Sequence, residues 1–279
     1  MGADIYYFTG TGNSLFIARE MQKRIPDARM IPIAGLIHQE RIESRAEVVG
    51  LVFPVQALTI PILVKQFLRK ADFSSSKYFC AIATRKNTVF RGFEAIDRLL
   101  KRQNRRLDAY CLVNMGHSDA RHEGYVVPGE AEIRSLEAAA LKKLDVFQDA
   151  VNRRIPFREE DTEYTVRPSR ALQRIVLWSM AASEYVGGVN YFYADSHCTG
   201  CGVCERVCPS RKIRLAGKRP VWQREAFCFM CFACLNFCPA RSVQIRSIPG
   251  VKSCTRENGR YPHPYATVKD IAAQKESAP

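Results

Sequence analysis

The sequence lacks any hydrophobic run long enough to cross a membrane: the longest covers only residues 175–182, whereas a spanning helix needs about 20 residues. Its first residues, MGADIYYFTGTGNS, show neither the basic stretch nor the cleavage site of a secretory signal, so we expect a cytoplasmic protein. Histidines number only 5, and no Ser-His-Asp set, HExxH motif or carboxylate pair predicts hydrolytic chemistry. With 16 glycines and 14 prolines in 279 residues, disordered and collagen-like chains are also excluded.

Cysteine, in contrast, is abundant, because the chain has 11 and eight of them lie between Cys198 and Cys238. They form two runs of one pattern, C-x2-C-x2-C-x3-C-P, which is typical of bacterial proteins that hold two [4Fe–4S] clusters. A zinc ribbon uses two CxxC pairs instead, and a disulfide framework would not repeat the same spacing. The runs therefore predict two iron–sulfur clusters.

The spacing also predicts which cysteines share a cluster. Three thiolates two residues apart reach three corners of one cubane, and the fourth cysteine ligates the cluster of the other run. We expect this crossing because the fourth cysteine should open a short helix that points away from its own loop. The predicted ligands are Cys198, Cys201, Cys204 and Cys238 for cluster 1, and Cys228, Cys231, Cys234 and Cys208 for cluster 2.

The chain before these runs alternates strand-like and helix-like segments. Residues 48–53 (VVGLVF) and 78–84 (YFCAIAT) are continuous apolar runs, typical of strands that are buried on both faces of a parallel sheet. Five such strands and about five helices predict a doubly wound α/β domain over residues 1–155. We expect a helical linker over 156–195, a small α+β cluster domain over 196–250, and a polar tail over 251–279.

A glycine-rich loop follows the first predicted strand and opens a helix. A dinucleotide fingerprint would need glycine where Leu15 stands, and a nucleoside-triphosphate loop would need a lysine that is absent. Backbone amides and hydroxyl groups at a helix N-terminus can hold a phosphate without a cation, which suits the monophosphate of FMN. The alternative is a plain strand-to-helix turn. The loop consists of Thr9, Gly10, Thr11, Gly12, Asn13 and Ser14.

TGTGNS after the first strand and FPVQALTIP after the third resemble the two flavin loops of flavodoxins. With the cysteine runs, the chain resembles the flavodoxin–bacterial ferredoxin fusion proteins of anaerobic bacteria. The resemblance implies a flavodoxin-like, five-stranded parallel sheet followed by a 2[4Fe–4S] ferredoxin domain, with FMN as a third cofactor. It also implies flavin-ring contacts from two loops, which here lack an aromatic residue to stack on the ring. These contacts are Pro54, Val55 and Gln56 in one loop, and Thr84, Arg85 and Asn87 in the other.

Two charges in the second ring loop bear on the flavin itself. If Arg85 and Lys86 face the ring, they favour an anionic reduced flavin, because a nearby cation stabilises the charged form. This expectation depends on where the guanidinium of Arg85 points.

The net charge of the chain is +14, from 42 basic and 28 acidic residues. Basic residues gather between the two cysteine runs, which predicts a docking face for an acidic redox protein. Nucleic-acid binding is disfavoured, because no recognised module or interleaved aromatic pattern is present.

Taken together, the motifs predict an electron-transfer protein that passes electrons between two [4Fe–4S] clusters and FMN and links low-potential redox partners. We expect an electron carrier rather than a dedicated enzyme, since the cofactors carry the chemistry. Two alternatives remain. One is a flavin-dependent reductase of a small acceptor, and the other is a redox-sensing regulator whose flavodoxin-like domain binds no flavin.

Overall fold

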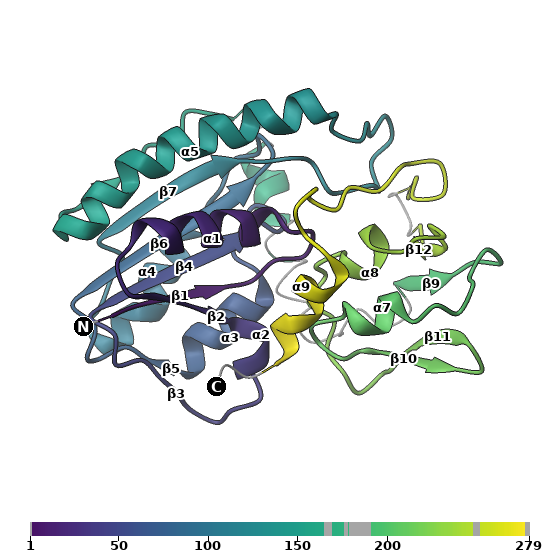
Figure 1. Ribbon diagram of the computed structural model, residues 1–279, viewed down its shortest axis with the longest axis horizontal. Helices are drawn as coiled ribbons and strands as arrows, with labels where there is room; N and C mark the ends of the chain where they lie inside the picture. Colours follow the sequence, from purple (N-terminus) through teal and green to yellow (C-terminus); the bar gives the residue numbers. More distant parts are fainter. Residues whose placement is uncertain (1, 165–168, 176–177, 179–190, 248–251, 277–279) are drawn as a thin grey trace.

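The computed structural model describes residues 2–164, 169–175, 178, 191–247 and 252–276, and its N-terminal part is built on one parallel sheet (Figure 1). The sheet order is β2-β1-β4-β6-β7-β8, and every pairing in it is parallel. The strands are β1 (Ala3–Tyr7), β2 (Ala28–Pro32), β4 (Val48–Pro54), β6 (Tyr78–Arg85), β7 (Ala109–Asn114) and β8 (Phe157–Arg158).

The first five of these strands have the order 2-1-3-4-5, which defines the flavodoxin-like doubly wound fold. The predicted fold class is therefore confirmed, but the sheet has six strands rather than five. The sixth, β8, pairs only Phe157 and Arg158 with β7, and two residues are too few to give an apolar run in the sequence. Residues that we expected at the start of a linker thus extend the sheet.

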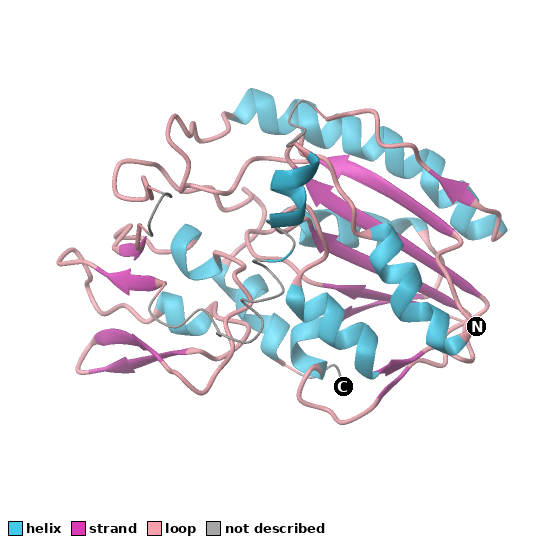
Figure 2. Ribbon diagram, turned by 180° about the vertical axis from the view of Figure 1, so that it is seen from behind, coloured by secondary structure: helices cyan, strands magenta, loops and turns pink. Residues whose placement is uncertain are grey.

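Helices cover both faces of the sheet. On one face lie α1 (Asn13–Arg24) and α5 (Glu130–Arg153), whose apolar residues pack with β1, β6 and β7 in one core. On the other lie α2 (Ile33–Leu36), α3 (Ile62–Lys70) and α4 (Phe93–Leu100), in front of the strands in the reverse view (Figure 2). Two residue pairs of β3 (Ile42–Glu43) and β5 (Ala71–Asp72) form a separate small ladder, and η1 (Lys101–Gln103) continues α4.

The C-terminal part is assembled from short elements around the cysteine runs. Its strands pair antiparallel, β9 with β12 and β10 with β11. Each run contains one short helix, and these two helices contact each other. The elements are β9 (Phe192–Ala194), α7 (Val203–Arg206), β10 (Ile213–Ala216), β11 (Arg219–Trp222), α8 (Ala233–Asn236) and β12 (Val243–Ile245).

The last described segment, which we expected to be a polar tail, folds back between the two parts of the molecule. It contains α9 (Val268–Ala272) and η2 (Ala273–Lys275), and in Figure 1 it is the yellow segment between the sheet and the short helices α7 and α8. Tyr261, His263 and Gln274 are buried in it. We call residues 261–275 the strap.

The expected linker is described only in part. Residues 157–163 lie on the N-terminal sheet and hold side chains of β6 and α5. Residues 170–175 and 178 are helical, whereas residues 165–168, 176–177 and 179–190 of the expected linker lie outside the described part of the chain. In the described ranges, no helix combines the length and the apolar character that a membrane crossing requires.

Candidate functional site

Four of the eight clustered cysteines line one cavity at the edge of the C-terminal part. Its wall is formed by residues 198–204 and by Leu215, Pro220, Cys238, Ala240, Ser242 and Val243. Gly200 and Gly202 have φ values of 72° and 76°, which glycine adopts without steric cost and which let the loop curl around the cavity. The cysteines on this cavity, called set 1, are Cys198, Cys201, Cys204 and Cys238.

The other four cysteines form a second group, in which the thiols perturb one another. Burial, followed by repulsion from Cys208, raises the pKa of Cys228 to about 11. The same two causes raise the pKa values of Cys231 and Cys234. Set 2 consists of Cys208, Cys228, Cys231 and Cys234.

Each set thus combines three cysteines of one run with the fourth of the other, as the sequence predicts. The expected reason for the crossing was wrong in one respect. The helices α7 and α8 precede Cys208 and Cys238, so the fourth cysteine follows the short helix instead of opening it. Both helices begin after a residue in the left-handed conformation, Gly202 and Phe232 respectively, and the third cysteine lies inside the helix.

The donor chemistry of both sets fits a [4Fe–4S] cubane, because each supplies four thiols. Burial also raises the pKa of Cys204 to about 11, so that its thiol keeps its proton at neutral pH until a bound metal ion replaces that proton, which is then released to solvent. Among the residues that the structure describes, no three His, Cys, Asp or Glu side chains converge as they would on a single ion. A cubane holds its four thiolates further apart than one ion does.

Basic side chains lie beside both sets. Lys212 is buried, and its ammonium group donates to the carbonyl oxygens of Gln223, at 2.7 Å, and Ala226, at 2.5 Å. Burial lowers the pKa of Lys275, whereas the charge of the Cys208 thiolate raises it. The guanidinium group of Arg260 donates to the Val243 carbonyl oxygen at 3.2 Å. Such cations offset the negative charge of a cluster and its thiolates.

The loop predicted to hold a phosphate ends at α1, as expected, and Gly12 caps the helix with a φ of 104°. The Thr9 hydroxyl accepts a hydrogen bond from the Gly12 amide at 3.0 Å, and the Ser14 hydroxyl lies 2.8 Å from that of Thr84. The predicted phosphate loop and the second ring loop therefore meet at the carboxyl edge of the sheet. This edge is the switch point where this fold class binds FMN.

The strap covers this loop by direct hydrogen bonds. The Thr9 amide donates to Gln274 Oε1 at 3.0 Å, and Gln274 Nε2 donates to the Thr9 carbonyl oxygen at 3.1 Å. The His263 amide donates to the Thr11 carbonyl oxygen at 2.7 Å, and the Tyr261 hydroxyl donates to Asn13 Oδ1 at 3.1 Å. The backbone and side chains of the predicted phosphate loop are thus engaged by the chain's own C-terminal segment.

The first ring loop contacts the second cysteine run. Gln56 Nε2 lies 3.3 Å from the carbonyl oxygens of both Phe229 and Met230, while Val55 donates its amide to the Thr84 carbonyl oxygen at 2.8 Å. Phe229 is only 5% exposed and belongs to the core around α3 and α4, with its ring 6.3 Å from that of Phe8. Pro54, the last residue of β4, ends the strand at this loop.

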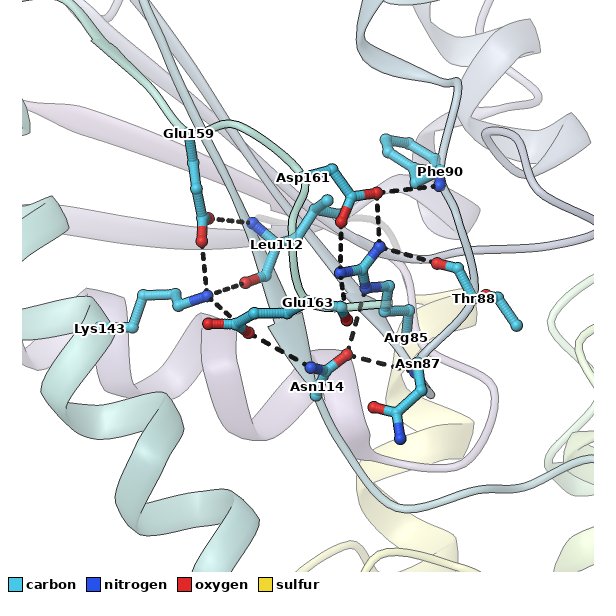
Figure 3. A network of polar contacts seen from close by, with 10 residues as sticks. All are labelled: Arg85, Asn87, Thr88, Phe90, Leu112, Asn114, Lys143, Glu159, Asp161 and Glu163. Carbon is cyan, nitrogen blue, oxygen red and sulfur yellow. Dashed lines mark hydrogen bonds and ion pairs between the residues drawn. The ribbon is translucent and has the colours of Figure 1, made fainter. Parts of the chain in front are cut away.

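In the second ring loop, Arg85 has a different neighbour from the one we expected. Its side chain is 1% exposed, and its guanidinium group binds both carboxylate oxygens of Asp161, at 2.6 and 2.7 Å (Figure 3). It also donates to the carbonyl oxygens of Thr88 and Glu163. Its charge is therefore neutralised by the segment after β8, and the structure gives no support to its predicted effect on a flavin ring.

The same segment is fastened at a second point. Lys143 of α5 donates to Glu159 at 2.6 Å and to the Leu112 carbonyl oxygen at 2.9 Å, while the Leu112 amide donates to Glu159 at 2.9 Å (Figure 3). Asn87, with a φ of 47°, donates its amide to Asn114 Oδ1 at 3.3 Å. These contacts make the second ring loop a structural junction between β6, β7 and residues 159–163.

Sequence reasoning missed the residues that cover the switch point. The segment expected to be a polar tail contains Tyr261 and His263, in the sequence YPHP. Nothing local marks Gln274, whose partner Thr9 lies 265 positions away. Phe229 stands between Cys228 and Cys231, where the cysteine spacing gives no sign that its side chain enters the N-terminal core.

Comparison with known proteins assigns the C-terminal part. Residues 190–256 match the family described as "4Fe-4S dicluster domain". This segment contains both cysteine runs, so the predicted pair of iron–sulfur clusters is confirmed as the cofactor type of this part. No curated protein matches the chain.

Several solved structures are similar to the N-terminal part. A flavodoxin from the domain Archaea is 10% identical (TM-score 0.34), with 53% of this chain and 99% of that one covered. Megasphaera elsdenii flavodoxin is 15% identical (TM-score 0.31), with 50% and 98% covered. Rubredoxin oxygen:oxidoreductase from the anaerobe Desulfovibrio gigas is 13% identical (TM-score 0.33), with 55% of this chain but only 36% of that chain covered.

The fold assignment of the N-terminal part rests on the strand order of its sheet. With the dicluster domain that follows, the chain has a flavodoxin–ferredoxin fusion architecture, and electron transfer is the general activity that this combination supports.

Proposed function

We propose that this protein exchanges electrons with redox partners through two [4Fe–4S] clusters. Set 1 would ligate cluster 1 and set 2 would ligate cluster 2. The observation that carries the proposal is the position of the two sets. Set 1 contains an exposed cysteine, Cys201, whereas the Cys231 carbonyl group of set 2 lies directly on Gly10 of the predicted phosphate loop. Cluster 1 would therefore face solvent, and cluster 2 would face the switch point.

The surface around cluster 1 supports an acidic protein as the partner. The hairpin β10–β11 brings Lys218 against Gly200, and Arg214, Lys218 and Arg219 are exposed beside it. Basic groups around an exposed cluster attract an acidic partner and orient it during the encounter. The rate of electron exchange should then fall as salt is added, because exposed charges are screened.

FMN is the third cofactor that the flavodoxin-like fold supports, with the hydroxyl groups of Thr9, Thr11 and Ser14 as its phosphate donors. In the arrangement described here the space over these residues is filled by other parts of the chain, so we route no electron through a flavin. Thr9, Thr11 and Ser14 are all more than nine-tenths buried in this arrangement. We propose a cytoplasmic location, because cysteines that ligate metal need a compartment in which glutathione keeps thiols reduced.

The filled switch point also favours a second candidate function, a redox-sensing regulator. In that case the flavodoxin-like part binds no flavin, and the oxidation state of cluster 2 acts on the segments that contact it. The two functions differ in turnover: a carrier exchanges electrons repeatedly with a soluble partner, whereas a regulator changes shape once for each change of redox state.

The ligand assignment is tested by pairs of substitutions in protein purified without oxygen. We expect about eight iron atoms per chain in the unmodified protein. In the variant Cys198→Ala/Cys238→Ala both lesions fall in set 1, so one intact [4Fe–4S] signal should remain in the EPR spectrum after reduction. In Cys198→Ala/Cys208→Ala each set loses a ligand, and no intact cluster signal should remain.

Cys254→Ala is the matched control, since this cysteine is buried but belongs to neither set. It should keep the full iron content. If instead Cys198→Ala/Cys208→Ala kept one intact cluster signal and Cys198→Ala/Cys238→Ala kept none, each run would ligate its own cluster. A chain that binds no iron at all would refute the proposed function.

A further inference from the structure

The space over the phosphate loop is occupied by two other segments of the chain. A Cβ atom built on Gly10 would lie 2.0 Å from the Cys231 carbonyl oxygen. One built on Gly12 would lie 2.3 Å from the Cβ of Ala266 and 2.8 Å from the Cβ of His263. A phosphate needs that same space, because it binds against the loop amides at the start of α1.

Of these two segments, the strap is the one that can leave the phosphate loop more easily. The other segment, the second cysteine run, is anchored in the N-terminal core by Phe229, whereas the apolar residues of the strap, Ala266, Val268 and Ile271, pack on the cluster part. The strap is held on the loop by the paired hydrogen bonds of Gln274 with Thr9 and by those of His263 and Tyr261. A capping box starts its short helix, in which Thr267 and Asp270 exchange hydrogen bonds, and Asp270 also pairs with Arg19 of α1.

A buried acceptor at the first ring loop points to a missing donor. Gln56 Oε1 is buried and has no hydrogen-bond partner within the described residues, although Gln56 Nε2 is engaged by the second cysteine run. Leaving such an atom without a donor costs free energy that a ligand carrying an N–H group would recover. The docked arrangement is therefore incompletely satisfied at the place where the fold class binds its flavin.

We propose that the strap is an internal competitor of FMN: it latches the cluster domain over the switch point, and FMN binds at Thr9–Ser14 only when the latch opens. This inference rests on the part of the proposed function that assigns FMN to this fold. The latch residues are Tyr261, His263 and Gln274. Since FMN binds only the open form, its apparent affinity is reduced by the fraction of molecules that are open.

The test is equilibrium dialysis of the full chain, with its clusters intact, against FMN. Gln274→Ala removes both hydrogen bonds to Thr9, and we expect it to bind FMN about tenfold more tightly than the unmodified protein. Adding Tyr261→Phe should increase the affinity further. Lys269→Ala is the matched control, because this side chain is exposed on α9 of the same strap, and its FMN affinity should not change.

Limited proteolysis reports the latch directly. Adding FMN to the unmodified protein should speed cleavage within residues 261–275, and Gln274→Ala should be cleaved quickly even without FMN. Riboflavin, which has no phosphate, should bind all variants more weakly than FMN does.

Equal FMN affinity in the unmodified protein and in both latch variants would overturn the proposal. So would a strap that proteolysis shows to be open in Gln274→Ala while no flavin binds; that result would favour the regulator. Iron content and cluster reduction, measured on the same samples, test the proposed electron transfer separately.

Discussion

Phe229 joins the two parts of the molecule, and its truncation is the sharpest test of how they are coupled. The residue stands between the predicted cluster ligands Cys228 and Cys231, yet its side chain is buried in the core of the N-terminal part, next to Phe8. Its ring is only 5% exposed. In Phe229→Ala the cluster loop would lose its apolar anchor, while its cysteines would remain unchanged.

The magnitude follows from the burial. Truncating a buried phenylalanine to alanine costs about 3–5 kcal/mol, from the lost transfer free energy and the cavity that remains. The ring has one edge-on aromatic neighbour in Phe8 and a tilted one in Phe227, so we expect a value near the lower limit, about 3 kcal/mol. Phe229→Leu keeps most of the apolar volume and should cost only about 1 kcal/mol.

The assay is urea unfolding without oxygen, followed by circular dichroism for the sheet and by absorbance for the clusters. In the unmodified protein we expect the two transitions to coincide, because one loop serves both parts. In Phe229→Ala the free energy of unfolding should fall and the cluster transition should come first. Val221→Ala, at a 44% exposed position of β11, is the control and should change little.

The reasoning would be refuted by a Phe229→Ala protein whose stability lies within 1 kcal/mol of the unmodified protein, with coincident transitions. That result would mean that the loop is held by its iron ligands alone.

Three further expectations concern other parts of the structure. Asp161→Ala leaves the buried Arg85 guanidinium unpaired and should lower the free energy of unfolding by about 3 kcal/mol, whereas Glu132→Ala, which breaks the more exposed pair with Lys86, should cost less than about 1 kcal/mol; urea titration compares them. Removing iron with a chelator should unfold residues 191–247 and leave the N-terminal sheet folded, and hydrogen exchange would show fast amides throughout if the sheet also depended on iron. Lys212→Met should lower the reduction potential of cluster 2 and leave that of cluster 1 unchanged, since it removes a buried cation near Cys228; a potentiometric EPR titration that shows equal shifts would assign Lys212 no local role.

The sequence predicts those features that leave a local or periodic signal. The apolar runs at 48–53 and 78–84 are strands β4 and β6, because both faces of these strands are covered by helices. The cysteine spacing predicts two crossed groups of four, and the structure brings the same cysteines together. Both signals can be read in a short stretch of sequence. A continuous apolar run marks a strand that is buried on both faces, and a fixed spacing marks the cysteines.

Contacts between distant segments leave no such signal. Arg85 looks like a free cation in a loop until Asp161 is placed beside it, 76 positions later. The tail between 251 and 279 is polar overall, and its few buried residues, such as Tyr261 and Ile271, are too scattered to show a helical or strand period. Its role as a strap over Thr9 depends on tertiary packing alone.

The pairing of Gln274 with Thr9 also has a consequence for the order of events during synthesis. Thr9 precedes its partner by 265 residues, so its loop leaves the ribosome long before the strap does. Because domains fold as units from the N-terminal side, the sheet is complete well before the strap emerges. The nascent protein therefore passes through a stage in which the carboxyl edge of its sheet is bare, and that edge is closed only after residues 261–275 have been added.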